Sequence, residues 1–69
     1  MENKIHELRT AKKVSQSDFA DALGVTRQTI ISLEKGKYNA SLILAHKIAE
    51  YFEQTIEDIF IFNGEDESL

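Results

Sequence analysis

The side chains best suited to chemistry lie in one short stretch, residues 27–35. At helical spacing, one face of this stretch carries Arg27, Gln28, Ile31, Ser32 and Lys35. These residue types recognise base edges in the major groove of DNA, because Arg pairs with guanine, Gln with adenine, Ser with several bases and an apolar group with the thymine methyl. The same face also suits a solvated helix, although Ile31 fits that alternative least well.

Catalytic and metal-binding chemistry have little support in the sequence. The chain has no cysteine, and its two imidazoles, His6 and His46, fall on different predicted helices. It also has no glycine-rich phosphate loop and no His-x-x-x-His or Glu-x-x-His pair. We therefore expect no enzyme activity, no metal and no cofactor, and we expect both histidines to lie at the surface.

Hydroxyl side chains mark the starts of most of the predicted helices. Ser15, Thr26, Ser41 and Thr55 each precede an apolar pattern of helical period. We predict helices over about residues 4–12, 16–23, 27–35 and 42–52, and a short fifth helix after Thr55. In the fourth helix, one apolar stripe is predicted from Leu42, Ala45, Ile48, Ala49 and Phe52. Residues 59–62 either finish the fifth helix or turn into a short strand.

The two helices over residues 16–35 meet the steric demands of a helix-turn-helix. Ala20 is small where the second helix must cross the first, and Gly24 tolerates a left-handed backbone in the turn. Val25 supplies an apolar anchor, and Ile30 and Leu33 face inward from the second helix. This framework leaves the face that begins at Arg27 pointing outward.

The chain resembles the Cro/CI-type (XRE) helix-turn-helix family over about residues 3–60. The resemblance is carried by Leu8-Arg9, Ser15-Gln16, Phe19-Ala20 and residues 23–30, 33–39 and 56–60. It implies an all-α, five-helix lambda-repressor-like domain, which we place over residues 1–63. The acidic residues that follow predict a flexible tail over residues 64–69. It also implies a sequence-specific DNA-binding transcriptional regulator that acts as a repressor.

The resemblance implies roles for individual residues. Gln28 and Ser32 match base-reading positions, with Arg27 and Thr29 beside them, and the outward face of the helix adds Ile31 to this set. Phosphate contacts are implied for Gln16, Lys35, Lys37 and Asn39. Arg9 and Glu34 match a buried ion pair, the alternative being two exposed charges that contribute about 0–1 kcal/mol. Glu53 stands where the family has glycine, so a left-handed backbone there would cost about 1 kcal/mol.

Charge is distributed unevenly along the chain. The formal net charge is −4, but residues 1–37 carry seven basic and five acidic side chains, whereas residues 38–69 carry one basic and seven acidic ones. This asymmetry is typical of a protein whose basic part faces the phosphates of double-stranded DNA. Chance together with an acidic solubilising tail is the alternative explanation of the charge. The alternative function is a protein-interaction module of the same fold, such as an antitoxin or a regulator of another repressor, whose acidic half binds a basic partner.

The apolar residues near the end of the chain predict a homodimer. Ile59 and Phe60 are expected to complete the core of the monomer, while Ile56, Ile61 and Phe62 are expected to form the dimer interface. The alternative is that all five belong to the monomer core. No targeting sequence or membrane span is recognised, which indicates a cytoplasmic protein.

Overall fold

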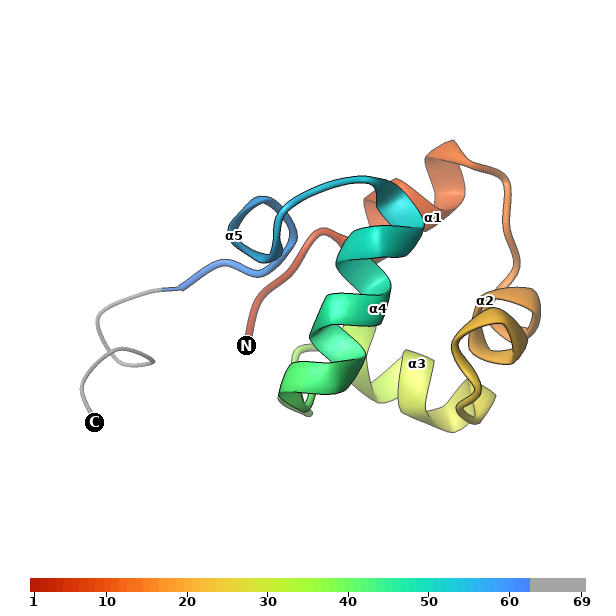
Figure 1. The fold of residues 1–69 in the computed structure, drawn as a ribbon. Coiled ribbons are helices and arrows are strands. Elements are labelled where there is room, and N and C mark those ends of the chain that lie inside the picture. The colour runs from red at the N-terminus through yellow and green to blue at the C-terminus, as the bar shows by residue number, and fades with distance from the viewer. Residues whose placement is uncertain (63–69) are drawn as a thin grey trace.

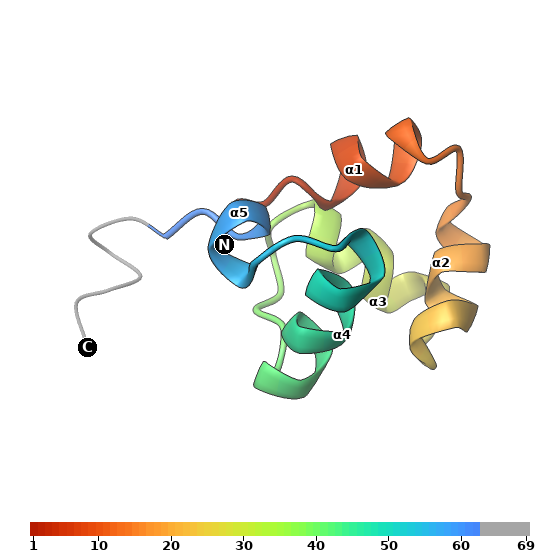
Figure 2. The same ribbon diagram turned by 45° about the horizontal axis from the view of Figure 1, so that its top comes forward.

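In the computed structural model, which describes residues 1–62, the chain forms five α-helices (Figure 1). Their bounds are α1 Ile5–Ala11, α2 Gln16–Leu23, α3 Arg27–Glu34, α4 Leu42–Phe52 and α5 Ile56–Ile59. Figures 1 and 2 show α4 in the middle of the molecule, with α2 and α3 on one side and α5 on the other. The predicted all-α fold is confirmed.

The predicted capping residues start the last four helices. The hydroxyl oxygens of Ser15, Thr26, Ser41 and Thr55 each accept a hydrogen bond from the backbone N–H three residues ahead. At α5 the bond is reciprocal, because the Asp58 carboxylate accepts from the Thr55 N–H. Local sequence therefore determines where these helices begin.

The start of α1 is held by contacts from elsewhere in the chain. Lys4 makes no side-chain cap. Instead, Asn3 Oδ1 accepts from the Ile5 N–H at 3.1 Å, and Asn3 Nδ2 donates to the Leu33 carbonyl at 2.7 Å. One asparagine thus ties the first helix to the end of α3.

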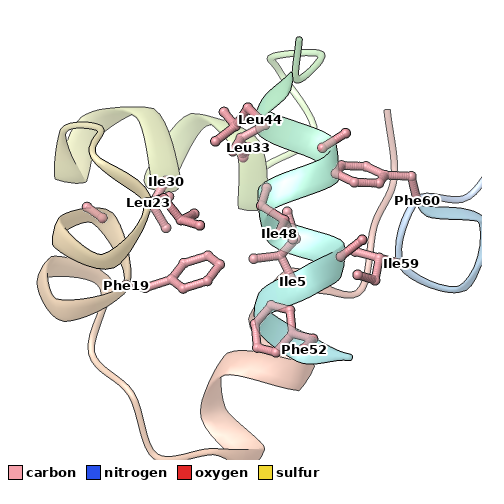
Figure 3. Close-up of a cluster of buried hydrophobic side chains, with 13 residues drawn as sticks. Ile5, Phe19, Leu23, Ile30, Leu33, Leu44, Ile48, Phe52, Ile59 and Phe60 are labelled. Carbon is pink, nitrogen blue, oxygen red and sulfur yellow. The ribbon is translucent and has the colours of Figure 1, made fainter. Parts of the chain in front are cut away.

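The core lies between α4 and the other helices (Figure 3). Phe19 points from α2 towards α4, and Ile5 and Ile48 lie at the centre. The fully buried large side chains are Ile5, Phe19, Ile30, Leu33, Ile48 and Ile59. This packing covers the inner faces of α2 and α3 and leaves their outer faces uncovered.

One prediction about α4 is wrong. Leu42, predicted to be in the core stripe, is 79% exposed, and Leu44 is buried in its place. At 3.6 residues per turn, the two leucines lie on opposite edges of a stripe centred near Ile48 and Phe52. Neighbouring elements decide which edge is covered, and the periodicity of the helix alone cannot.

The segment after α5 pairs with the N-terminal residues. Lys4 N donates to the Ile59 carbonyl at 2.8 Å, and Ile61 N donates to the Glu2 carbonyl at 2.9 Å. The sequence left open whether residues 59–62 form a short strand. Among residues 1–62, the structure contains one antiparallel bridge, between Asn3 and Phe60. Ile59 and Phe60 are buried, as predicted. The predicted acidic tail over residues 64–69 lies outside the described residues.

Candidate nucleic-acid interface

The turn between α2 and α3 is built as the sequence predicts. Gly24 adopts the left-handed conformation with φ 74°, and the Val25 N–H donates to the Ala20 carbonyl at 3.0 Å. Ala20 is 1% exposed, so its small side chain lies where the helices cross. Val25 is half-buried and packs against the core. This arrangement fixes the angle between the helices and turns the outer face of α3 towards solvent.

The predicted base-reading residues lie along that outer face. Arg27 and Gln28 are exposed, and Ile31 and Ser32 are half-buried. Thr29 is half-buried and engaged locally, because its hydroxyl lies 3.0 Å from the Thr26 hydroxyl. The two exposed side chains are therefore at the N-terminal end of α3, the end that reaches base edges first when such a helix enters the groove.

Tyr38 is a residue of this surface to which sequence reasoning assigned no role. It is 44% exposed and lines a shallow depression together with Gln28 and Ser32. An aromatic residue in a polar loop directly after the predicted reading helix was the available signal. Tyr38 therefore adds an aromatic side chain to the edge of the outer face of α3.

The predicted phosphate contacts divide into two groups. Lys35, Lys37 and Asn39 are all exposed in the segment after α3. Gln16 is half-buried at the first position of α2, where the first backbone N–H groups of a helix have no intrahelical partner and favour anions. Gln16 and Arg27 line one shallow depression, so the fold brings α2 and the start of α3 together there.

Arg9 and Glu34 form a buried ion pair between α1 and α3. Arg9 Nε donates to Glu34 Oε2 at 2.7 Å, and Arg9 Nη2 donates to Glu34 Oε1 at 3.2 Å. The side chains are 9% and 7% exposed. Arg9 Nη1 also donates to the Val14 carbonyl at 2.8 Å. The pair thus fixes the end of α3 against α1 and the segment before α2.

The pair keeps both groups charged. Burial acts to raise the pKa of Glu34, but hydrogen bonds from Arg9 and Gln16 outweigh burial and hold that pKa below its ordinary value of 4.5. The hydrogen bond to Glu34 raises the pKa of Arg9. Each group therefore stabilises the ionised form of the other.

Comparison with known proteins identifies the family. The profile described as Helix-turn-helix matches residues 5–59. The chain belongs to the Cro/CI-type helix-turn-helix family of DNA-binding transcriptional regulators. An uncharacterized HTH-type transcriptional regulator of Methanocaldococcus jannaschii is 52% identical over 66 residues, which cover 96% of this chain and 100% of that relative. A similar uncharacterized regulator of Bacillus subtilis is 47% identical over 60 residues, covering 87% and 91% of the two chains.

A solved structure supports the same fold for this regulator. The restriction-modification controller protein C.AhdI from Aeromonas hydrophila matches with a TM-score of 0.74 at 33% identity. The match covers 83% of this chain and 86% of that chain. The predicted lambda-repressor-like fold and the predicted DNA-binding regulator are confirmed.

A second surface of this helix-turn-helix regulator is apolar. The predicted interface residues Ile61 and Phe62 are 39% and 44% exposed, and Ile56 is half-buried. Ile56 and Phe62 line one pocket with Leu42, whereas Ile61 is not among the residues that line it. Ile43 on α4 is 71% exposed. Sequence reasoning missed the exposed part of α4 because it assigned Leu42 to the core.

Three other properties of the described residues follow from the same structure. None of the helices within residues 1–62 is long and apolar enough to cross a membrane. In the same part of the chain, no group of three His, Asp or Glu side chains is arranged to hold a metal ion. His6 and His46 have exposed side chains.

Proposed function

We propose that this regulator is a repressor that binds a palindromic operator as a homodimer, with α3 in the major groove. The observation that carries the proposal is the uncovered polar face at the start of α3, where Arg27 and Gln28 are both exposed. A groove about 12 Å wide admits a helix in this orientation.

In this proposal, the side chains of α3 specify the sequence. Gln28 forms a bidentate contact with adenine and Arg27 with guanine, while Ser32 accepts or donates to a neighbouring base. Ile31 packs on a thymine methyl. Thr29 lies beside these residues and supports their contacts indirectly, because its own hydroxyl already lies 3.0 Å from the hydroxyl of Thr26.

Residues at the two ends of the motif hold the DNA backbone. Gln16 and the first N–H groups of α2 bind one phosphate, and Lys35, Lys37 and Asn39 bind others. Phosphate contacts position the protein and make affinity depend on salt, but they do not read the sequence.

A homodimer supplies the specificity that one motif lacks. A single helix-turn-helix contacts few base pairs, and two copies on a twofold axis read half-sites about 34 Å apart. The exposed Ile61 and Phe62 and the half-buried Ile56 offer an apolar surface for the second copy. Bound over a promoter, such a dimer excludes other proteins, and we therefore expect repression.

Selection of bound sequences from a random DNA pool tests the proposal. We expect a palindrome with half-sites about one helical turn apart, and affinity that falls steeply as salt is raised. Enrichment of a single half-site would contradict the homodimer. Recovery of no common sequence would contradict base reading by α3.

A further inference from the structure

We propose that Glu34 is a positioning residue for DNA binding, because its carboxylate orients the side-chain amide of Gln16 towards a phosphate. This inference rests on the proposed phosphate contact of Gln16. Gln16 Nε2 donates to Glu34 Oε1 at 3.3 Å, across 18 positions of the sequence. The ion pair of Glu34 with Arg9 thus extends to the DNA-facing depression that Gln16 lines.

The carboxylate is a rigid acceptor. Arg9 donates to both of its oxygens, and Arg9 is itself anchored by the Val14 carbonyl. With side chains only 9% and 7% exposed, neither Arg9 nor Glu34 is free to turn towards solvent. Gln16 therefore meets an oxygen whose position is set by the core and not by the DNA.

The charge of Glu34 determines which way the Gln16 amide faces. An ionised carboxylate only accepts hydrogen bonds, so it attracts the amide NH₂ group and repels the amide oxygen. One N–H of Nε2 is directed at Glu34, and the second N–H remains for an oxygen of the DNA backbone. The opposite orientation would present the Gln16 carbonyl to a phosphate and weaken binding.

A third neighbour shares the same carboxylate. His6 Nδ1 lies 3.3 Å from Glu34 Oε1 and 3.1 Å from Arg9 Nη2. A neutral His6 ring accepts from Arg9 through Nδ1 and leaves the Glu34 oxygen to Gln16.

We expect Glu34 to raise the DNA affinity because it orders the Gln16 side chain before the DNA binds. Freezing one long side chain on binding costs about two- to tenfold in affinity. Loss of the Glu34 carboxylate should lower the DNA affinity by that factor through Gln16, and should leave contacts made by Arg27 unchanged.

A double-mutant cycle separates this role from a structural one. Replacing a buried ion pair by apolar residues usually preserves stability, so Arg9→Met/Glu34→Leu removes the carboxylate with little expected loss of fold. We expect this change to lower affinity about two- to tenfold in the wild-type background and to have no further effect with Gln16→Ala. With Arg27→Ala as the matched control, the two effects should multiply.

The outcomes distinguish the inference from the function on which it rests. If the effects of Arg9→Met/Glu34→Leu and Gln16→Ala multiply, Glu34 does not act through Gln16 and the inference is overturned. If Gln16→Ala leaves affinity unchanged while Arg27→Ala lowers it, the phosphate contact of Gln16 is wrong and the inference fails with it. If the wild type binds no DNA, the proposed function itself fails.

Side-chain amide relaxation in the free protein provides a direct readout. We expect the Gln16 NH₂ group to be more ordered than that of the exposed Gln28, and to lose that order in Arg9→Met/Glu34→Leu. The Gln28 group should be unaffected by the change. Equal order of the Gln16 group in both proteins would overturn the inference.

Discussion

The outer face of the helix-turn-helix and the surface formed by α4, α5 and the segment after α5 differ in the chemistry that they expose. The first presents polar side chains, of which Arg27 and Gln28 are the most accessible. The second presents apolar ones, with Leu42 79% and Ile43 71% exposed. Both surfaces lie on one small core, packed around Phe19 and Ile48 (Figure 3).

The difference indicates two kinds of partner. Exposed polar groups are well solvated and exchange water for the polar edges of DNA. Exposed apolar groups gain free energy only when another apolar surface removes them from water. We therefore propose that α3 binds the DNA and that α4 and α5 bind the second copy of the chain.

The largest expected effect comes from the ion pair of Arg9 and Glu34, which holds the end of α3. Arg9→Met leaves the Glu34 carboxylate buried without its partner and should lower the free energy of unfolding by about 3–5 kcal/mol, measured by urea denaturation. The exposed pair of His46 and Glu50, 3.1 Å apart on α4, is the control. His46→Ala should change stability little. A small effect of Arg9→Met would show that the ion pair is not a structural anchor.

The ion pair of Arg9 and Glu34 should also make the stability of the fold depend on pH. The pKa of Glu34 is lower in the folded chain than its ordinary value of 4.5, so the folded chain binds fewer protons in that range. The contribution of the pair is complete above pH 4.5 and is lost as the pH falls through the lowered pKa. Urea titrations from neutral to acid pH should show this loss in the wild type. Arg9→Met/Glu34→Leu should lack that part of the acid sensitivity.

Two aromatic residues of equal exposure test the assignment of partners. Phe62 and Tyr38 are each 44% exposed, one on the apolar surface and one beside α3. Phe62→Asp should weaken dimerisation by about tenfold or more, measured by sedimentation, and should leave helicity largely intact. Tyr38→Asp should leave the sedimentation mass unchanged and lower DNA affinity. An unchanged mass for Phe62→Asp would remove the predicted dimer interface.

Within the proposed DNA-binding surface, substitutions at base contacts and at phosphate contacts should affect DNA binding differently. Gln28→Ala should cost about 1–3 kcal/mol on the selected operator and relax the preference at one base pair. Lys37→Ala should weaken binding to all sequences alike and reduce the salt slope by about 1. Competition binding at several salt concentrations measures both. If Gln28→Ala weakened binding to all DNA sequences equally, Gln28 would be shown to contact the DNA backbone and not a base.

The smallest expected effects concern two left-handed positions. Gly24 in the turn has φ 74°, and Glu53 after α4 has φ 55°. An added Cβ at Gly24 meets nothing within 4 Å, so Gly24→Ala should cost only the backbone strain, about 1 kcal/mol. Glu53→Gly should stabilise by a similar amount. Denaturant midpoints that move in the same direction for Gly24→Ala and Glu53→Gly would contradict this prediction.

Features set by neighbouring residues were predictable from the sequence. The four hydroxyl caps act over three residues, and the left-handed conformations of Gly24 and Glu53 follow from their places after helices. The predicted bounds of α1 differ from the observed ones by one residue at each end, and those of α3 by one residue at the C-terminal end. Local chemistry thus defines the elements and most of the outer face of α3.

Features set by distant parts of the chain were not predictable in the same way. The exposure of Leu42 depends on what covers each edge of α4, which no single helix specifies. The bond from Gln16 to Glu34 joins the first position of α2 to the last of α3, and only the crossing of these helices brings them together. Lys13 adopts a left-handed backbone with φ 58° although no glycine marks the position.

Amide chemical shifts recorded while the selected operator is added test the central assignment most directly. We expect the largest changes along Arg27–Lys35 and at the first residues of α2, with the amides of Leu42 and Ile43 largely unaffected. Changes concentrated at Leu42, Ile43 and Phe62, with the outer face of α3 unperturbed, would contradict the account.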